Sequence, residues 1–213
     1  METDEFNDYL SYIPEKWRSV FQEKDREKRI EKTLNIWKTY VSKELRKTIH
    51  YLEENLLEVD FITYQGKMAI LYEIKYKEEI FYYEGILTID FSKNIILKQN
   101  WNEIPKSIVN FYTNVHNGFY DYPSHSGLVE LNEVMYFNDY EWGIVEELEN
   151  PPEINFETTF GFFCSGGGGY VAIDIKEQEE DISVVWYDDC EPDYHINFWD
   201  VVDEWMIIEF ENI

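Results

Sequence analysis

The chain has 213 residues, of which 44% are hydrophobic and 18% aromatic, enough apolar material for one domain or two small ones. Its net charge of −26 is uneven: residues 1–100 carry 19 acidic and 16 basic side chains, net −3, whereas residues 101–213 carry 25 and 2, net −23. Phosphate would be repelled by the second part, which argues against nucleic acid or an anionic membrane as its partner and favours a basic protein.

The sequence predicts no targeting or membrane-spanning segment. The N-terminal stretch METDEFNDYLSYIP is acidic and lacks the basic and apolar regions of a signal peptide. No apolar run approaches the length of a membrane span. Two cysteines, Cys164 and Cys190, do not make a disulfide framework, so both are expected to be thiols. These features predict a cytoplasmic protein, and an acidic surface that serves only solubility is the alternative to a binding role.

The first hundred residues predict helices followed by strands. Two short helices are expected over 4–24, and apolar residues at steps of three and four predict one long helix over 25–55. Its basic residues are interspersed with glutamates, which favours a solvated face. Alternating patterns over 58–99 predict two hairpins with turns at 65–66 and 93–94, giving a four-strand meander packed on the long helix.

The second part predicts a helix starting at Pro105 and stopped by Gly118. A short helix is expected over 131–137 and a loop over 143–157. The last helix is expected to begin at Asn197, an N-cap residue, with Trp199 off its apolar stripe and exposed.

A run of four glycines lies between two apolar segments, over residues 166–169. A phosphate-binding loop would also contain a lysine and open into a helix. Here no lysine is near, and residues 170–175 alternate like a strand. The glycines therefore predict a tight or bulged connection between antiparallel strands.

Three elements in order resemble the SUKH superfamily, the bacterial immunity proteins related to fungal regulators of cell-wall glucan synthesis. They are a helix from Ile104-Pro105 to an Asn117-Gly118 turn, a Gly127-Leu128 step into a short helix, and a glycine-rich entry to a Tyr-x-Ala-x-Asp strand. The resemblance covers about residues 101–210. The residues that carry it include Pro105, Asn117, Gly118, Gly167, Gly168, Gly169, Tyr170 and Asp174.

The resemblance implies an α+β fold in which helices flank an antiparallel sheet, with no catalysis and no cofactor. It implies an immunity protein that binds and neutralises a toxin, often a basic nuclease, inside the producing cell. Residues 101–213 would form this binding domain. Residues 1–100, which carry the helices and the meander, would be either a separate domain or an extension that completes the sheet.

The partner-binding residues are expected in two acidic and aromatic segments. Aromatic and charged anchors carry most of the energy of a typical interface. The candidates are Trp186, Tyr187, Asp188, Asp189, Glu191, Asp193, Tyr120 and Tyr122. A regulatory scaffold without a toxin partner is the alternative from another functional class.

Metal and catalytic sites are less favoured by the sequence. The acidic turn over 188–193 lacks the ligand spacing of a calcium-binding loop, and Cys164, Cys190 and His195 lack the paired spacing of zinc ligands. A hydrolase built on His116 and His125 would need a nucleophile elbow that the sequence does not contain. His116 is instead expected to cap the end of its helix, where a positive charge or a donor is favoured.

Overall fold

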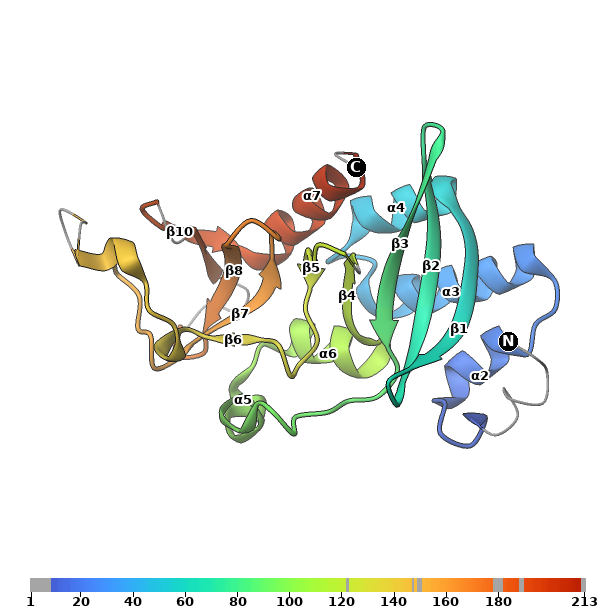
Figure 1. Cartoon of the computed structure of the whole chain (residues 1–213), viewed down its shortest axis with the longest axis horizontal. Helices are drawn as coiled ribbons and strands as arrows, with labels where there is room; N and C mark the ends of the chain where they lie inside the picture. Colours follow the sequence, from blue (N-terminus) through green and yellow to red (C-terminus); the bar gives the residue numbers. More distant parts are fainter. Residues whose placement is uncertain are drawn as a thin grey trace.

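A computed structural model describes residues 9–121, 123–146, 148, 151–177, 182–187 and 190–211. The described strands form a ten-stranded antiparallel sheet with the order β1-β2-β3-β4-β5-β7-β8-β9-β10, and β6 pairs with β7 (Figure 1). The strands are β1 (Leu56–Tyr64), β2 (Lys67–Tyr76), β3 (Glu79–Ile86), β4 (Asn117–Asp121), β5 (Gly127–Leu128), β6 (Met135–Tyr136), β7 (Thr159–Cys164), β8 (Gly169–Asp174), β9 (Ile182–Tyr187) and β10 (Asp193–Asn197). The expected α+β class is confirmed.

Helices flank the sheet, as expected. The α-helices are α2 (Glu15–Phe21), α3 (Arg26–Val41), α4 (Arg46–Asn55), α5 (Ile95–Asn100), α6 (Lys106–Asn114) and α7 (Phe198–Glu211). Three short 3₁₀ segments are η1 (Trp101–Glu103), η2 (Phe137–Asp139) and η3 (Gly143–Glu146). Within the described ranges no helix is long and apolar enough to cross a membrane.

The single long helix expected over 25–55 is wrong, because the chain breaks it into α3 and α4. Asp25 caps α3 by accepting a hydrogen bond from the Lys28 amide at 3.1 Å. Leu45, just before α4, has non-helical dihedral angles and offers no side-chain cap. The break leaves the amides at the start of α4 free to bond elsewhere, and Asp203 of α7 accepts them.

The expected meander has three strands rather than four. The turn at Gln65-Gly66 is confirmed, and both residues have positive φ, as a two-residue hairpin turn of type I′ requires. The second turn lies at residues 77–78, between β2 and β3. The turn expected at Lys93-Asn94 is wrong, because Asn94 caps helix α5 by accepting from the Leu97 amide at 3.1 Å.

Helix α6 begins after Pro105, as predicted, but the next two predictions fail. Asn117-Gly118 opens strand β4 instead of a turn, and Gly127-Leu128 is strand β5. A turn, β6 and the start of η2 replace the short helix expected over 131–137. Gly118, at φ +78°, lets its backbone approach the chain at 128–130, where a Cβ would meet atoms at 2.9–3.0 Å.

The glycine run joins two antiparallel strands, as predicted. Strands β7 and β8 pair in a hairpin whose connection contains Gly166 and Gly168 at positive φ. Asn197 accepts a hydrogen bond from the Asp200 amide at 3.0 Å and caps α7 as expected. The exposure expected for Trp199 is wrong: its side chain packs against Phe111 and Phe198 and is buried.

Helices α3, α4, α6 and α7 contact the sheet and lie behind it in Figure 1. The other face is covered only in part. On β8, Val171 and Ile173 belong to the core under the helices, whereas Ala172 packs in a second cluster with Phe137 and Trp142. Because side chains alternate along a strand, the segment after β6 must cover the opposite face of β8 and β9. None of the described segments covers the face of β1–β4 opposite the helices, which we call the open face.

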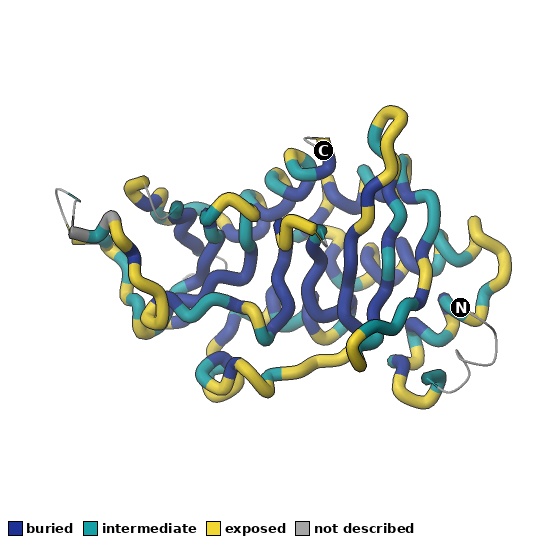
Figure 2. Tube along the Cα trace, viewed as in Figure 1, coloured by how far each residue is buried: buried dark blue, intermediate teal, exposed yellow. Residues whose placement is uncertain are grey.

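The sheet runs through the boundary expected at residue 100. Strand β3 pairs with β4, with Glu84 opposite Tyr120, and one buried core contains residues from both parts of the chain. Of the two arrangements considered for residues 1–100, the strand pairing matches an extension that completes the sheet. Figure 2 shows the buried strands continuing across the middle of the molecule.

Candidate binding site on the open sheet face

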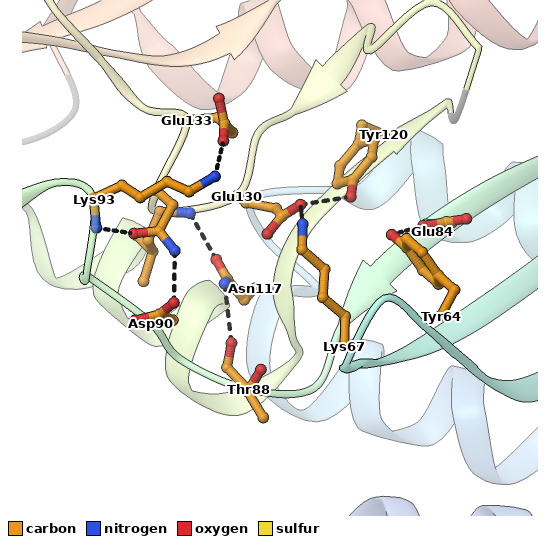
Figure 3. Close-up of polar contacts among 12 residues, drawn as sticks. Tyr64, Lys67, Glu84, Thr88, Asp90, Lys93, Asn117, Tyr120, Glu130 and Glu133 are labelled. Atoms are coloured by element: carbon orange, nitrogen blue, oxygen red, sulfur yellow. Dashed lines mark hydrogen bonds and ion pairs between the residues drawn. The ribbon is translucent and has the colours of Figure 1, made fainter.

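The open face carries a line of polar side chains that crosses four strands. Strand register places Tyr64 of β1 opposite Lys67 of β2, and Glu84 of β3 opposite Tyr120 of β4. Glu130, in the turn after β5, lies beside them (Figure 3). We call Tyr64, Lys67, Glu84, Tyr120 and Glu130 the open-face network.

The members of the open-face network are joined by short contacts. The Tyr64 hydroxyl donates to Glu84 Oε2 at 2.7 Å, and the Tyr120 hydroxyl donates to Glu130 Oε1 at 2.9 Å. Lys67 Nζ lies 2.5 Å from the same Glu130 oxygen. The two tyrosine hydroxyls also lie close enough for each to shift the pKa of the other.

Burial changes the acid–base behaviour of this network. Glu84 is only 4% exposed and Glu130 only 7%. Desolvation raises the pKa of Glu84, and the nearby Glu130 raises it further, against the effects of Tyr64 and Lys67. Burial also raises the pKa of Tyr64 and of Tyr120, so both stay protonated as donors. Two carboxylates thus share one lysine in a partly dry site.

Replacing Glu84 by glutamine is expected to raise the free energy of unfolding at pH 7 by about 1 kcal/mol. The raised pKa means that folding favours the protonated acid, so the carboxylate lowers stability once the pH passes through that pKa. The gain should therefore disappear as the pH falls to about 4. Urea unfolding at both pH values tests this.

Glu73→Gln is the matched control, since Glu73 lies on the same open face of β2 and is half-buried. We expect this variant to change the unfolding free energy by less than about 0.5 kcal/mol. A Glu84→Gln protein less stable than the wild type at pH 7 would show that the carboxylate stabilises the fold.

A groove of about 380 Å³ adjoins the network. Its polar walls are Lys67, Tyr120, His125, Glu130 and Glu133. Its apolar walls are Val129, Met135, Cys164 and Tyr170. The volume lies in the usual range of ligand pockets, and the mixture of apolar wall and few polar groups is typical of a binding site.

The structure scatters the partner-binding residues predicted from sequence. Trp186 is fully buried and stacks on Trp142 at 4.2 Å, so its expected place on a binding surface is wrong. Tyr187 is half-buried against Trp205, and Glu191 and Asp193 are exposed beyond β9. Asp188, Asp189 and Tyr122 lie outside the described residues.

One predicted contact residue and one predicted motif residue do meet at the groove, beside His125 and Cys164. Tyr120, a predicted contact, and Tyr170, a predicted motif residue, line it from β4 and β8. The other motif residues have structural places. Gly167 and Gly168 lie in the β7–β8 connection, and Gly169 is the first residue of β8. Asp174, at the end of β8, accepts a hydrogen bond from the Lys176 amide at 2.9 Å.

The histidine pair considered for hydrolysis is divided between the two faces of the sheet. His125 lines the groove, whereas His116 packs among Trp17, Trp37 and Phe111 on the helical side. The expectation that His116 caps a helix end is wrong, because it is buried and hydrogen-bonded to Tyr72 and Gly118. Within the described chain, no three His, Cys, Asp or Glu side chains are grouped to hold a metal.

Sequence reasoning missed Lys67, Glu84 and Glu130. One signal was present: Glu84 stands in an apolar strand, on the face opposite Phe81 and Tyr83. An acid in that position is either solvated or part of a buried polar site. Lys67 and Glu130 are 63 residues apart, and only the fold brings them together.

Searches of family models, of curated proteins and of solved structures found no match to this chain.

Proposed function

We propose that the chain is a bacterial immunity protein that acts in the cytoplasm, without catalysis or cofactor, by binding and neutralising a basic protein toxin such as a nuclease. One observation carries the proposal: in a protein of net charge −26, no described segment covers a sheet face that carries apolar, acidic and lysine side chains. The resemblance of residues 101–210 to immunity proteins supports the same function.

The open face has the composition of a protein interface. Register places Asp60 opposite Leu71, Leu71 opposite Glu84, and Glu73 opposite Tyr82. Tyr82 is 43% exposed and the neighbouring Ile80 is 49% exposed. Stable protein complexes typically have aromatic anchors surrounded by a polar rim. Such an interface buries roughly 1,600 Å² in total on the two partners.

Electrostatics decide what kind of partner suits this face. The net charge of −26 would repel an anionic partner and would speed association with a cationic one, by roughly 10- to 1,000-fold at low salt. Glu191 and Asp193, the described acidic residues of the turn predicted from sequence, lie at the other end of the sheet, between β9 and the start of β10. The open face and that turn are therefore two surfaces that mutations can distinguish.

The proposal is tested by co-expressing the chain with the toxin encoded beside its gene and scoring survival. A binding titration at two salt concentrations accompanies it. Survival together with tight binding that weakens as salt rises is the expected result. A chain that neither rescues the cells nor binds the toxin would overturn the immunity function and favour the regulatory scaffold.

A further inference from the structure

We infer that the groove beside Lys67 and Glu130 receives one arginine side chain of the partner, whose guanidinium takes the place of the Lys67 ammonium on Glu130. The inference rests on the proposed function for the existence of a basic partner. Its geometry concerns only the groove and the open-face network.

The ion pair at the groove is asymmetric. The side chain of Glu130 is 9% exposed, whereas that of Lys67 is 41% exposed. The Tyr120 hydroxyl donates a hydrogen bond to Glu130 Oε1 at 2.9 Å, and this bond fixes the position of the carboxylate. Lys67 is the first residue of β2, beside the hairpin turn, and its long stem can turn outward into water. The Lys67 ammonium can therefore be displaced by another cation, whereas the Glu130 carboxylate stays in place.

The charges around the groove call for a further cation. Lys67 lies beside two buried carboxylates, Glu84 and Glu130, and Glu133 adds a third carboxylate at the rim. Glu133 has a distant contact of its own with Lys93, at 3.9 Å. An anion would be repelled here, and an apolar group would leave the buried carboxylates without their cation.

The shape and lining of the groove favour arginine. The aliphatic stem of an arginine can pack on Val129 and Met135. Its planar guanidinium can stack on the tyrosine rings of the wall and offers five donors in a fork that matches a carboxylate. A lysine ammonium offers only a point charge, and Lys67 already supplies one. The guanidinium can therefore bond to Glu130 in a way that Lys67 cannot reproduce.

The test measures binding of a blocked arginine, N-acetyl-arginine methylamide, to the full chain by NMR titration. The blocking groups remove the terminal charges, so the probe represents a side chain within a protein. Lys67→Met removes the internal competitor and should tighten binding at least 5-fold, with shifts at Tyr120 and Met135. Glu130→Gln should abolish those shifts. The neutral isostere N-acetyl-citrulline methylamide should not bind.

Lys75→Met is the matched control, because Lys75 is an exposed lysine of the same strand and its loss changes the net charge equally. Lys67→Gln repeats the test if the methionine variant does not fold. Equal affinity of the probe for the Lys67 and Lys75 variants, or shifts elsewhere on the surface, would overturn the inference.

The outcome separates the groove from the proposed function. Tighter probe binding to Lys67→Met with no toxin rescue would leave the arginine site standing and remove the immunity role. Toxin rescue together with unchanged affinity of Lys67→Met for the probe would support the immunity role and remove the arginine site.

Discussion

Replacing Asp203 by alanine is expected to lower the free energy of unfolding by about 3 kcal/mol. Asp203 is buried on α7 and receives three hydrogen bonds of 2.8 Å from the start of α4. They come from the amides of Lys47 and Thr48 and from the Thr48 hydroxyl. The carboxylate therefore supplies the cap that Leu45 lacks, and its charge is favourable at a helix N-terminus.

The size of the effect comes from what the variant leaves behind. Thr48 is fully buried, so its amide and hydroxyl would lose their partner without gaining water. The same contact ties α7 to the N-terminal helices across 155 residues of sequence. Urea unfolding of Asp203→Ala measures the loss.

Glu204→Ala is the matched control. Glu204 is the next residue of α7 and pairs with Lys47, but both side chains are half exposed. Exposed pairs contribute little, so this variant should lose less than about 1 kcal/mol. If Asp203→Ala were no less stable than Glu204→Ala, the contact would not hold α4 to α7.

Acidification is expected to destabilise the protein through His116. Burial lowers the pKa of His116 to about 3, and nearby Lys16 acts in the same direction. The His116 Nδ1 atom lies 2.5 Å from the Gly118 carbonyl oxygen, which can only accept, so Nδ1 carries the proton. Nε2 then accepts from the Tyr72 hydroxyl at 2.9 Å, and the Tyr72 oxygen accepts from Trp37 Nε1 at 3.2 Å. The network requires a neutral ring.

A histidine whose pKa is lowered by folding contributes stability above its unfolded pKa of about 6.5, and that stability is lost as the pH falls toward the folded pKa. The loss through His116 should reach about 2 kcal/mol at pH 5 and about 3 kcal/mol at pH 4. Comparing urea unfolding of the wild type and His116→Gln between pH 7 and pH 4 isolates it. The variant should start less stable, and the difference should shrink by these amounts.

His50→Gln serves as the control, since its side chain is 71% exposed on α4. The unfolding free energy of this variant should stay within about 0.5 kcal/mol of the wild-type value at each pH. An NMR titration reads the same group directly: the ring signals of His116 should not move above pH 5. Titration of that ring near pH 6 would contradict the neutral network.

Local patterns predicted those elements whose cause is local. The 65–66 turn, the β7–β8 hairpin, the helix start at Pro105 and the cap at Asn197 follow from residues within a few positions. The helix break before α4 could not be read in this way. Its apolar spacing is helical throughout, and the partner that stabilises the break is Asp203.

A glycine and an aromatic residue account for two further errors. The Asn117-Gly118 pair reads as a turn, but the fold uses the positive φ of Gly118 for close approach to the backbone of residues 128–130. Trp186 stands beside acidic residues and reads as exposed, yet the segment after β6 folds back to cover it with Trp142. The open-face network depends on strand register, which a single sequence does not fix.

The claim that the open face binds the toxin is tested most directly by comparing two charge-reversed variants whose net charges are equal. One carries Asp60→Lys and Glu73→Lys on the open face, and the other carries Glu191→Lys and Asp193→Lys in the acidic turn. Their association rates with the toxin encoded beside the gene are measured at low salt. We expect the open-face protein to associate at least 10-fold more slowly, with a flatter salt dependence, and the turn protein to stay within about 2-fold of the wild type. A slow turn protein beside an unaffected open-face protein would contradict the account.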